Sequence, residues 1–413
     1  MDEFTQDPTF HDVLPEGSLL LDELHLRAGN SRSTNSEDIL PANFRSPSLR
    51  EIAKYGGYST YSVQGNTDPF VRESLKLYSR DIYEEIYGFT RRPQGTMGMY
   101  KGLARYSGEN KTFSSLSPSQ QSCMRTAISR ARKAFKLPYK RQPLDWHEVG
   151  QFLRRDTAAG VSFPGKKKGE VLEEIYHKAR WLGHRLKQDG KQSFDPTRVQ
   201  FPPCVAGQRG HMSDRDDPKT RLVWIYPSEM LVVEGQYAPL MYRDFMNEPK
   251  SPMLNGKSAQ RLFVEWAAKQ RPGEKLYGLD ISGFDTDVMT MLNYVAFDVL
   301  KQNVDFETWR GKPVSTQERQ KWANVWDGMV WYFVNTPILM PDGRMFRKTR
   351  GVPSGSWWTQ MVDSVVNYIY IQYFAECQQT EARELRVLGD DSAFMNNGAF
   401  SVERAVVDAA AIG

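Results

Sequence analysis

Cysteine is scarce in this chain, and the sequence shows no signal of secretion or membrane insertion. Three cysteines, Cys123, Cys204 and Cys377, are widely separated in 413 residues. A small, odd and scattered set offers neither a disulfide framework nor the ligand spacing of a zinc site, and it indicates a reducing compartment. The N-terminus has no basic segment followed by an apolar core, and no apolar run reaches the length of a membrane span. We therefore expect a soluble protein that does not contact a membrane.

A large excess of charge is also missing, because the formal net charge is only +4. The basic residues are nevertheless unevenly placed. The segment 121–200 holds 18 Lys and Arg against 8 Asp and Glu, which leaves the rest of the chain acidic. Such a block would suit the binding of nucleic-acid phosphates, although a solvated helical surface explains it equally well. Hydrophobic residues make up 40% of the chain, enough for a large globular core.

The most informative segment is Val-Leu-Gly-Asp-Asp-Ser at 387–392. Apolar residues on both sides predict two short strands, and Gly389 permits a tight reversal between them. The hairpin would present Asp390 and Asp391 at its tip. Two adjacent carboxylates concentrate negative charge, which a hard divalent cation with oxygen ligands commonly neutralises. Taken alone, this short motif more often marks an ordinary acidic β-turn.

A second acidic segment lies upstream, at 275–285. It is an apolar, strand-like run that ends at Asp280, followed by a glycine-containing turn and Asp285. If Asp280 lies beside Asp390 and Asp391, the three carboxylates would hold two Mg²⁺ or Mn²⁺ ions about 4 Å apart. Such a pair suits in-line phosphoryl transfer, with one ion at the attacking hydroxyl and the other at the leaving pyrophosphate. Asp285 lies beyond the turn, where it could accept a hydrogen bond from a ribose hydroxyl.

Between these acidic segments, a loop rich in Pro, Gly and Ser at 350–359 opens a long helical pattern. Apolar residues recur at helical spacing over 358–374 and predict a core face. Thr359, Asp363 and Asn367 recur at intervals of four residues and form one polar stripe on that helix. An ordinary amphipathic helix with a solvated polar side is the alternative interpretation.

The order of these residues resembles motifs A, B and C of viral RNA-dependent RNA polymerases. The segment Gly-Val-Pro-Ser-Gly-Ser-Trp-Trp-Thr-Gln-Met-Val-Asp-Ser-Val-Val-Asn is most similar to the polymerases of partitiviruses, which have segmented double-stranded RNA genomes. Picobirnaviruses are close relatives. The resemblance implies that Asp280, Asp390 and Asp391 are the catalytic acids and bind the two metal ions.

The resemblance also implies a nucleotide-binding site in which Asp285 and Asn367 together recognise the ribose 2′-hydroxyl. One departure concerns the asparagine. In many positive-strand RNA polymerases it lies four residues after the threonine, where this chain has Asp363, whereas the partitivirus-like pattern has the longer spacing. The further nucleotide-binding residues that the resemblance implies are Ser354, Gly355 and Thr359.

Two upstream segments resemble motifs F and G. In Asp-Pro-Lys-Thr-Arg-Leu-Val-Trp-Ile, Lys219 and Arg221 alternate along a strand, so both would face the same way and could grip triphosphate oxygens. A solvated strand face is the alternative for this pair. The segment 157–164 resembles the template entrance, although a Gly/Pro turn alone is more often just a loop. The expected template-binding residues are Thr157, Gly160, Lys166, Lys167 and Lys168.

The fold that this resemblance implies is an α+β right-hand polymerase with an antiparallel palm sheet flanked by helices. We expect an N-terminal arm at 1–60, docked through Leu19-Leu20-Leu21. Fingers would follow at 61–270 and a palm at 271–413, with a fingers-like insertion at about 303–346. Only 22 residues follow Asp391. Motif D, motif E and the thumb are therefore expected to be missing, as in a truncated product or an incomplete reading frame.

The implied function is template-directed RNA synthesis for genome replication and transcription of a double-stranded RNA virus. The implied partners are an RNA template, the product duplex and ribonucleoside triphosphates, with a viral capsid protein as a further candidate. The implied location is the virion interior or the host cytoplasm. A noncatalytic RNA-binding or assembly fragment is the alternative. A reverse transcriptase fits Gly389 and Asp285 less well, and a two-metal nuclease explains neither the Ser354-Gly355 loop nor the basic pair.

Overall fold

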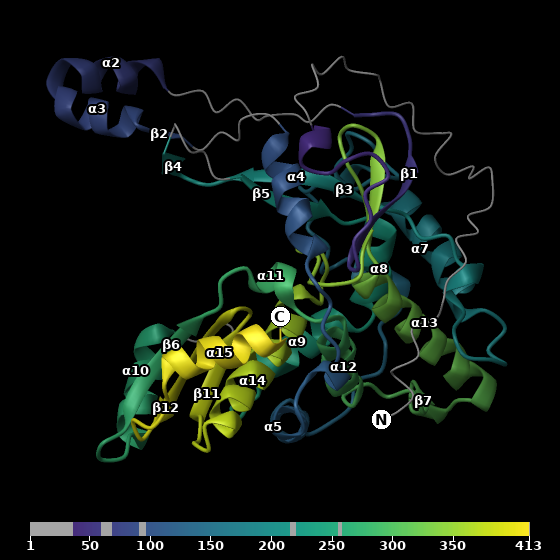
Figure 1. The fold of residues 1–413 in the computed structure, drawn as a ribbon. Helices are drawn as coiled ribbons and strands as arrows, with labels where there is room; N and C mark the ends of the chain where they lie inside the picture. The colour runs from purple at the N-terminus through teal and green to yellow at the C-terminus, as the bar shows by residue number, and fades with distance from the viewer. Residues whose placement is uncertain (1–35, 59–67, 91–95, 215–219, 255–257, 413) are drawn as a thin grey trace.

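Two β-sheets in different parts of the molecule organise the fold (Figure 1). The computed structural model describes residues 36–58, 68–90, 96–214, 220–254 and 258–412. The expected docking segment Leu19-Leu20-Leu21 and the expected phosphate ligand Lys219 lie outside these residues.

The larger sheet has five strands in the order β1-β10-β9-β3-β5. All neighbours are antiparallel except β3 and β9, which are parallel. Strands from the beginning, middle and later part of the chain are therefore joined in one sheet, and part of the expected N-terminal arm is its edge strand. The strands are β1 (Leu49–Lys54), β3 (Cys204–Gly210), β5 (Thr220–Ile225), β9 (Pro337–Leu339) and β10 (Arg344–Lys348).

The smaller sheet has three antiparallel strands in the order β11-β12-β6. β6 (Lys275–Asp280) is paired along its full length with β12 (Asp391–Asn396), and β11 (Arg383–Leu388) forms the other edge. The rings of Tyr277 and Phe394 stack across β6 and β12 at 5.4 Å between centroids. This cross-strand pair fixes the register of the acidic residues at the strand ends.

Helix α14 (Thr359–Cys377) runs through the core and packs against β11, β12 and three helices, α5 (Pro118–Ala134), α12 (Thr290–Lys301) and α15 (Val402–Ile412). Almost the whole helix is buried, including Asp363 at 4% exposure and Asn367 at 0%. The alternative of an amphipathic helix with a solvated polar side is therefore wrong. The polar stripe faces protein, so its groups need protein or ligand partners.

Most of the remaining helices lie around the two sheets. Helices α2 and α3 form an antiparallel pair that lies apart from the other elements, while α10 lies beside the three-stranded sheet (Figure 1). These helices are α2 (Pro69–Tyr78), α3 (Arg80–Tyr87), α4 (Met97–Ala104), α6 (Trp146–Val149), α7 (Leu172–Lys187), α8 (Ser228–Gly235), α9 (Ala238–Asn247), α10 (Ala259–Lys269), α11 (Phe284–Asp287) and α13 (Thr316–Val334).

Short elements complete the architecture. The two-stranded pairs are β2 (Phe89–Thr90) with β4 (Ser213–Asp214), and β7 (Thr308–Trp309) with β8 (Lys312–Pro313). The 3₁₀ turns are Ser36–Asp38, Arg105–Ser107, Phe113–Ser115, Lys168–Glu170 and Pro196–Arg198. The whole is an α+β fold, as predicted. Among the described residues, no helix combines the length and the apolar character needed to cross a bilayer.

Candidate active site

Three acidic side chains lie at one end of the three-stranded sheet. Asp280 is the last residue of β6, and Asp391 is the first residue of β12 directly opposite it. Asp390 lies in the turn between β11 and β12, next to Gly389, whose φ of +66° is in the left-handed region. All three acids are exposed. The pairing of two strands thus joins residues that are more than a hundred positions apart in the sequence.

The acids repel one another. Partial burial, followed by the charges of Asp390 and Asp280, raises the pKa of Asp391. Oxygen ligands that concentrate negative charge in this way suit a hard divalent cation. Within the described residues, however, no group of three His, Cys, Asp or Glu side chains is already gathered closely enough to hold a metal ion. The donor chemistry fits Mg²⁺ or Mn²⁺, and binding would require the three carboxylates to draw together.

Helix α14 holds the acidic turn from behind. Ser364 Oγ accepts a hydrogen bond from the Gly389 amide at 2.9 Å, and Asn367 Nδ2 donates to the Gly389 carbonyl at 2.9 Å. A Cβ at position 389 would lie 2.8 Å from Gln360 Nε2. Both backbone groups of the turn glycine are therefore bound by one helix face. This contact fixes the backbone that carries Asp390 and Asp391.

The two candidate ribose-sensing positions differ in their surroundings. Asn367 donates its amide N–H to the turn, and its buried Oδ1 has no hydrogen-bond partner among the residues that the structure describes. Burial, followed by the charges of Asp285 and Asp390, raises the pKa of Asp363 well above its ordinary value. Desolvation and the charge of Asp390 also raise the pKa of Asp285, and the positive charge of Arg221 opposes this shift only in part. Asp363 is thus electrostatically coupled to Asp285.

The loop that opens α14 is tightly closed. Thr359 Oγ1 donates to the carbonyl oxygens of Pro353 at 2.6 Å and Ser356 at 3.1 Å. The exposed Ser354 accepts a hydrogen bond from the Trp224 amide at 3.2 Å. Glycine is required at 355, because a Cβ there would lie only 2.0 Å from the Trp224 carbonyl oxygen. The loop is therefore fastened to strand β5 while the Ser354 side chain remains accessible.

Arg221 lies on β5 with its side chain exposed, directly across from Arg209 on β3. Its charge reaches the site, since it lowers the pKa of Asp285. Arg209 was not among the expected site residues, because nothing in its local sequence predicts that β3 and β5 pair. Two guanidinium groups on neighbouring strands form a cationic surface suited to phosphate oxygens.

The expected template loop is a compact turn whose three lysines differ. Lys166 and Lys167 are exposed, whereas Lys168 is only 7% exposed. The Lys168 ammonium donates to Thr157 Oγ1 at 2.8 Å and to the Ala158 carbonyl at 2.7 Å. Lys168 therefore stabilises the loop and does not present its charge at the surface. Gly160 has φ +92°, and a Cβ there would lie 2.9 Å from Pro227 Cα.

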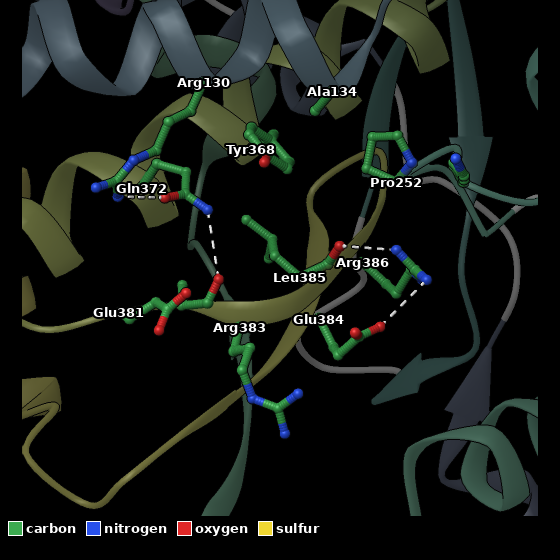
Figure 2. Close-up of a pocket in the computed structure, with 12 residues that line it drawn as sticks. Arg130, Ala134, Pro252, Tyr368, Gln372, Glu381, Arg383, Glu384, Leu385 and Arg386 are labelled. Carbon is green, nitrogen blue, oxygen red and sulfur yellow. Dashed lines mark hydrogen bonds and ion pairs between the residues drawn. The ribbon is translucent and has the colours of Figure 1, made fainter. Parts of the chain in front are cut away.

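A cavity of about 530 Å³ lies elsewhere, between α5, α14 and β11 (Figure 2). None of the expected site residues within the described part of the chain lines it. Its arginines already have acidic partners: Arg130 pairs with Glu376 at 2.7 Å and Arg386 with Glu384 at 3.5 Å. Arg383 points away from the other labelled arginines in Figure 2. The cavity is therefore separate from the acidic cluster.

Comparisons with known proteins agree on one family. A family model described as viral RNA-dependent RNA polymerase matches residues 46–413. The chain is 30% identical over 256 residues to the RNA-directed RNA polymerase of Cryptosporidium parvum virus 1 (strain KSU-1), covering 59% of this chain and 44% of that relative. It thus spans less than half of that relative's length.

Two solved structures have a similar fold. One is the RNA-dependent RNA polymerase of a human picobirnavirus, with TM-score 0.57 and 15% identity over 86% of this chain and 67% of that chain. The other is its insertion-loop deletion mutant, with TM-score 0.52 and 16% identity over 86% and 69% of the two chains. At these identities the likeness concerns the fold.

Proposed function

Because the chain belongs to the viral RNA-dependent RNA polymerase family, we propose that it carries the catalytic centre for two-metal, template-directed RNA synthesis in a double-stranded RNA virus. The observation that carries the proposal is the antiparallel register that places Asp391 opposite Asp280, with Asp390 in the adjoining turn. In this assignment the three-stranded sheet and α14 are the palm. The five-stranded sheet, together with its surrounding helices, belongs to the fingers.

Asp280, Asp390 and Asp391 would hold two Mg²⁺ or Mn²⁺ ions. When bound, such ions activate the attacking hydroxyl and stabilise the leaving pyrophosphate. The chain's own contribution is placement: the β6–β12 register and the bonds from α14 to Gly389 fix the backbone of the acids. A rigid backbone keeps the reacting groups aligned, which accounts for much of the rate in phosphoryl transfer.

The substrates would occupy the surfaces around these acids. We propose that Arg221, with Lys219, binds the triphosphate, and that Ser354, Gly355 and Thr359 shape the nucleotide site. Asp285 would accept the ribose 2′-hydroxyl, assisted by Asn367, with Asp363 as the competing assignment. The loop that contains Thr157, Gly160, Lys166 and Lys167 would guide the template. The proposed partners are therefore an RNA template, its product duplex and ribonucleoside triphosphates.

The metal assignment is tested by Asp390→Asn. The charge of Asp390 raises the pKa values of Asp391, Asp285 and Asp363, so its removal relieves repulsion. We expect Mn²⁺ affinity in calorimetric titration to fall by roughly tenfold or more, because a ligand and its charge are lost. The melting temperature without metal should be unchanged or higher.

Glu381→Gln is the matched control, since it removes the same charge at the other end of the hairpin. It should leave Mn²⁺ affinity unchanged. Equal Mn²⁺ affinity in wild type and Asp390→Asn would contradict the assignment. Primer extension on an RNA template then tests synthesis itself: RNA binding without Mg²⁺-dependent extension would favour the noncatalytic alternative.

A further inference from the structure

Helix α8 is buried along its whole length and contains two glutamates. Glu234 near its C-terminal end is completely buried. Its Oε2 accepts hydrogen bonds from Ser356 Oγ at 2.7 Å and from the Trp357 amide at 2.9 Å. A buried carboxyl that binds a loop rather than a basic side chain is costly to maintain. Its position therefore requires an explanation beyond filling space.

The bonds of Glu234 continue to the start of α14. Ser356 Oγ also accepts a hydrogen bond from the Trp358 amide at 3.0 Å, at the start of α14. The indole of Trp357 donates to the Leu231 carbonyl of α8 at 3.1 Å. The carboxyl thus fixes the loop before α14 and the first turn of that helix. The same helix binds both backbone groups of Gly389 further along.

We infer that Glu234 is a positioning residue for nucleotide addition, which acts by fastening the loop at 354–357 and the start of α14 to the fingers. The effect on nucleotide addition rests on the proposed function, whereas the contact between Glu234 and the loop is independent of it. Glu234 touches none of the proposed metal ligands. It acts through Ser356 and Trp357.

The surroundings of Glu234 make its protonation state adjustable. Burial raises the pKa of Glu234 to about 7, and the hydrogen bonds from Ser356 and the Trp357 amide, together with the nearby Tyr226 hydroxyl, oppose this shift. The titratable groups that interact electrostatically with Glu234 are Tyr226, which directly follows β5, and Cys204 on β3, and Cys204 in turn interacts with Lys348. Among the described residues, no basic group contributes to the pKa of Glu234. The hydrogen bonds favour the ionised carboxylate, which is the stronger acceptor, so within the folded protein the loop is held more tightly as pH rises through about 7. Burial of the same charge lowers the stability of the whole fold, which is a separate effect.

Glu229 provides a matched comparison on the same helix. It is also buried, and Ser162 Oγ donates to its Oε1 at 2.5 Å. Ser162 belongs to the template loop, which α8 also binds through Ser228 Oγ and the Ala159 carbonyl at 2.7 Å. Each glutamate therefore contacts a different loop. Replacing either one by glutamine changes the same charge in the same helix.

The test is hydrogen exchange of peptides that cover Trp357 and Ser162, in wild type, Glu234→Gln and Glu229→Gln, from about pH 6 to pH 8 and corrected for intrinsic rates. In wild type we expect protection of the Trp357 peptide to increase with pH. Glu234→Gln should remove that dependence and raise exchange roughly tenfold at high pH, with little change around Ser162. Glu229→Gln should instead raise exchange around Ser162, with little change in the Trp357 peptide.

Ser356→Ala is the second variant, because it removes the hydroxyl without altering the buried helix. It should also raise exchange at Trp357 while the melting temperature stays near that of wild type. Unchanged pH dependence of the Trp357 peptide in Glu234→Gln would overturn the inference. Because exchange does not require synthesis, that outcome is distinct from a failure of the proposed function. If synthesis is measurable, Glu234→Gln should lower kcat more than it raises KM.

Discussion

At the scale of single residues, the three consecutive lysines of the template loop have different roles. Lys166 and Lys167 are exposed, and Lys168 is buried against Thr157 and Ala158. Replacing both Lys166 and Lys167 by Ala should weaken RNA binding. The slope of log Kd against log salt concentration should decrease by roughly 1.4, because two phosphate contacts are lost. Filter binding over a series of salt concentrations measures this.

Lys168→Ala provides the contrast. It should reduce stability by about 1–3 kcal/mol, because the loop loses the two partly buried hydrogen bonds of the Lys168 ammonium. Its effect on the salt dependence should be small. An equal loss of salt dependence in Lys168→Ala and in the double variant would show that the loop rearranges to expose all three lysines.

Sugar selection is decided by single residues as well. If Asp285 accepts the ribose 2′-hydroxyl, Asp285→Ala should reduce the preference for ribonucleotides by about 1–3 kcal/mol in the ratio of incorporation efficiencies. Asn367→Ala should have a similar effect if Asn367 assists. If instead Asp363→Ala changes the preference and Asn367→Ala does not, the shorter motif spacing is correct. The electrostatic coupling of Asp363 to Asp285 makes that a specific alternative.

At the scale of elements, the β11–β12 hairpin depends on how its turn fits α14. Gly389 has φ +66°, and a Cβ would meet Gln360 Nε2 at 2.8 Å. Gly389→Ala should therefore destabilise the protein by about 1–3 kcal/mol in denaturant unfolding, through backbone strain and a steric conflict. Mn²⁺ affinity should fall with it, because the turn carries Asp390.

Gly273→Ala is the control for backbone strain alone. Gly273 has φ +82° with nothing within 4 Å of a Cβ. The Gly273→Ala substitution should lower the free energy of unfolding by about 1 kcal/mol and leave Mn²⁺ affinity unchanged. Adding Gln360→Ala to Gly389→Ala should recover the steric part of the loss. If the two glycine variants behave alike, α14 does not hold the turn.

At the scale of the whole molecule, buried acids govern how stability depends on pH. The pKa values of Asp285, Asp363, Asp391, Glu229 and Glu234 are all raised in the folded state. An acid whose pKa is higher in the folded state than its value of about 4 in the unfolded state stabilises the fold while it is protonated in both states. That stabilisation is lost as pH rises from the unfolded-state pKa to the folded-state pKa. The free energy of unfolding should therefore fall between about pH 4.5 and pH 7. We expect Glu234 to contribute on the order of 3 kcal/mol to this fall.

Thermal melts across this pH range check the sign. Glu234→Gln should flatten the slope. Saturating Mg²⁺ should raise the melting temperature most at the upper end of the range, because it binds the ionised acids. Asp390→Asn should lose that Mg²⁺-dependent increase. Stability that rises steadily over the same interval would show that other groups, such as the Glu274–Arg383 pair, dominate the titration.

Local sequence determined much of the candidate site and several elements. The Ser117 capping box with Gln120 and Pro118 begins α5, as the residues at that position predict. Gly389 permits the left-handed turn between two strands that are rich in apolar residues. Such features depend on backbone geometry and hydrogen bonds within a few residues. They can therefore be interpreted without knowing the rest of the fold.

Tertiary structure alone decided which distant groups meet and which charges are buried. The four-residue spacing of Thr359, Asp363 and Asn367 places them on one helix face, but only packing shows that this face is buried and that Asn367 binds the hairpin. Likewise, three identical lysines in a row contain no signal that Lys168 turns inward. Burial and long-range pairing depend on the simultaneous packing of segments from the whole chain, because a single segment cannot bury its own surface.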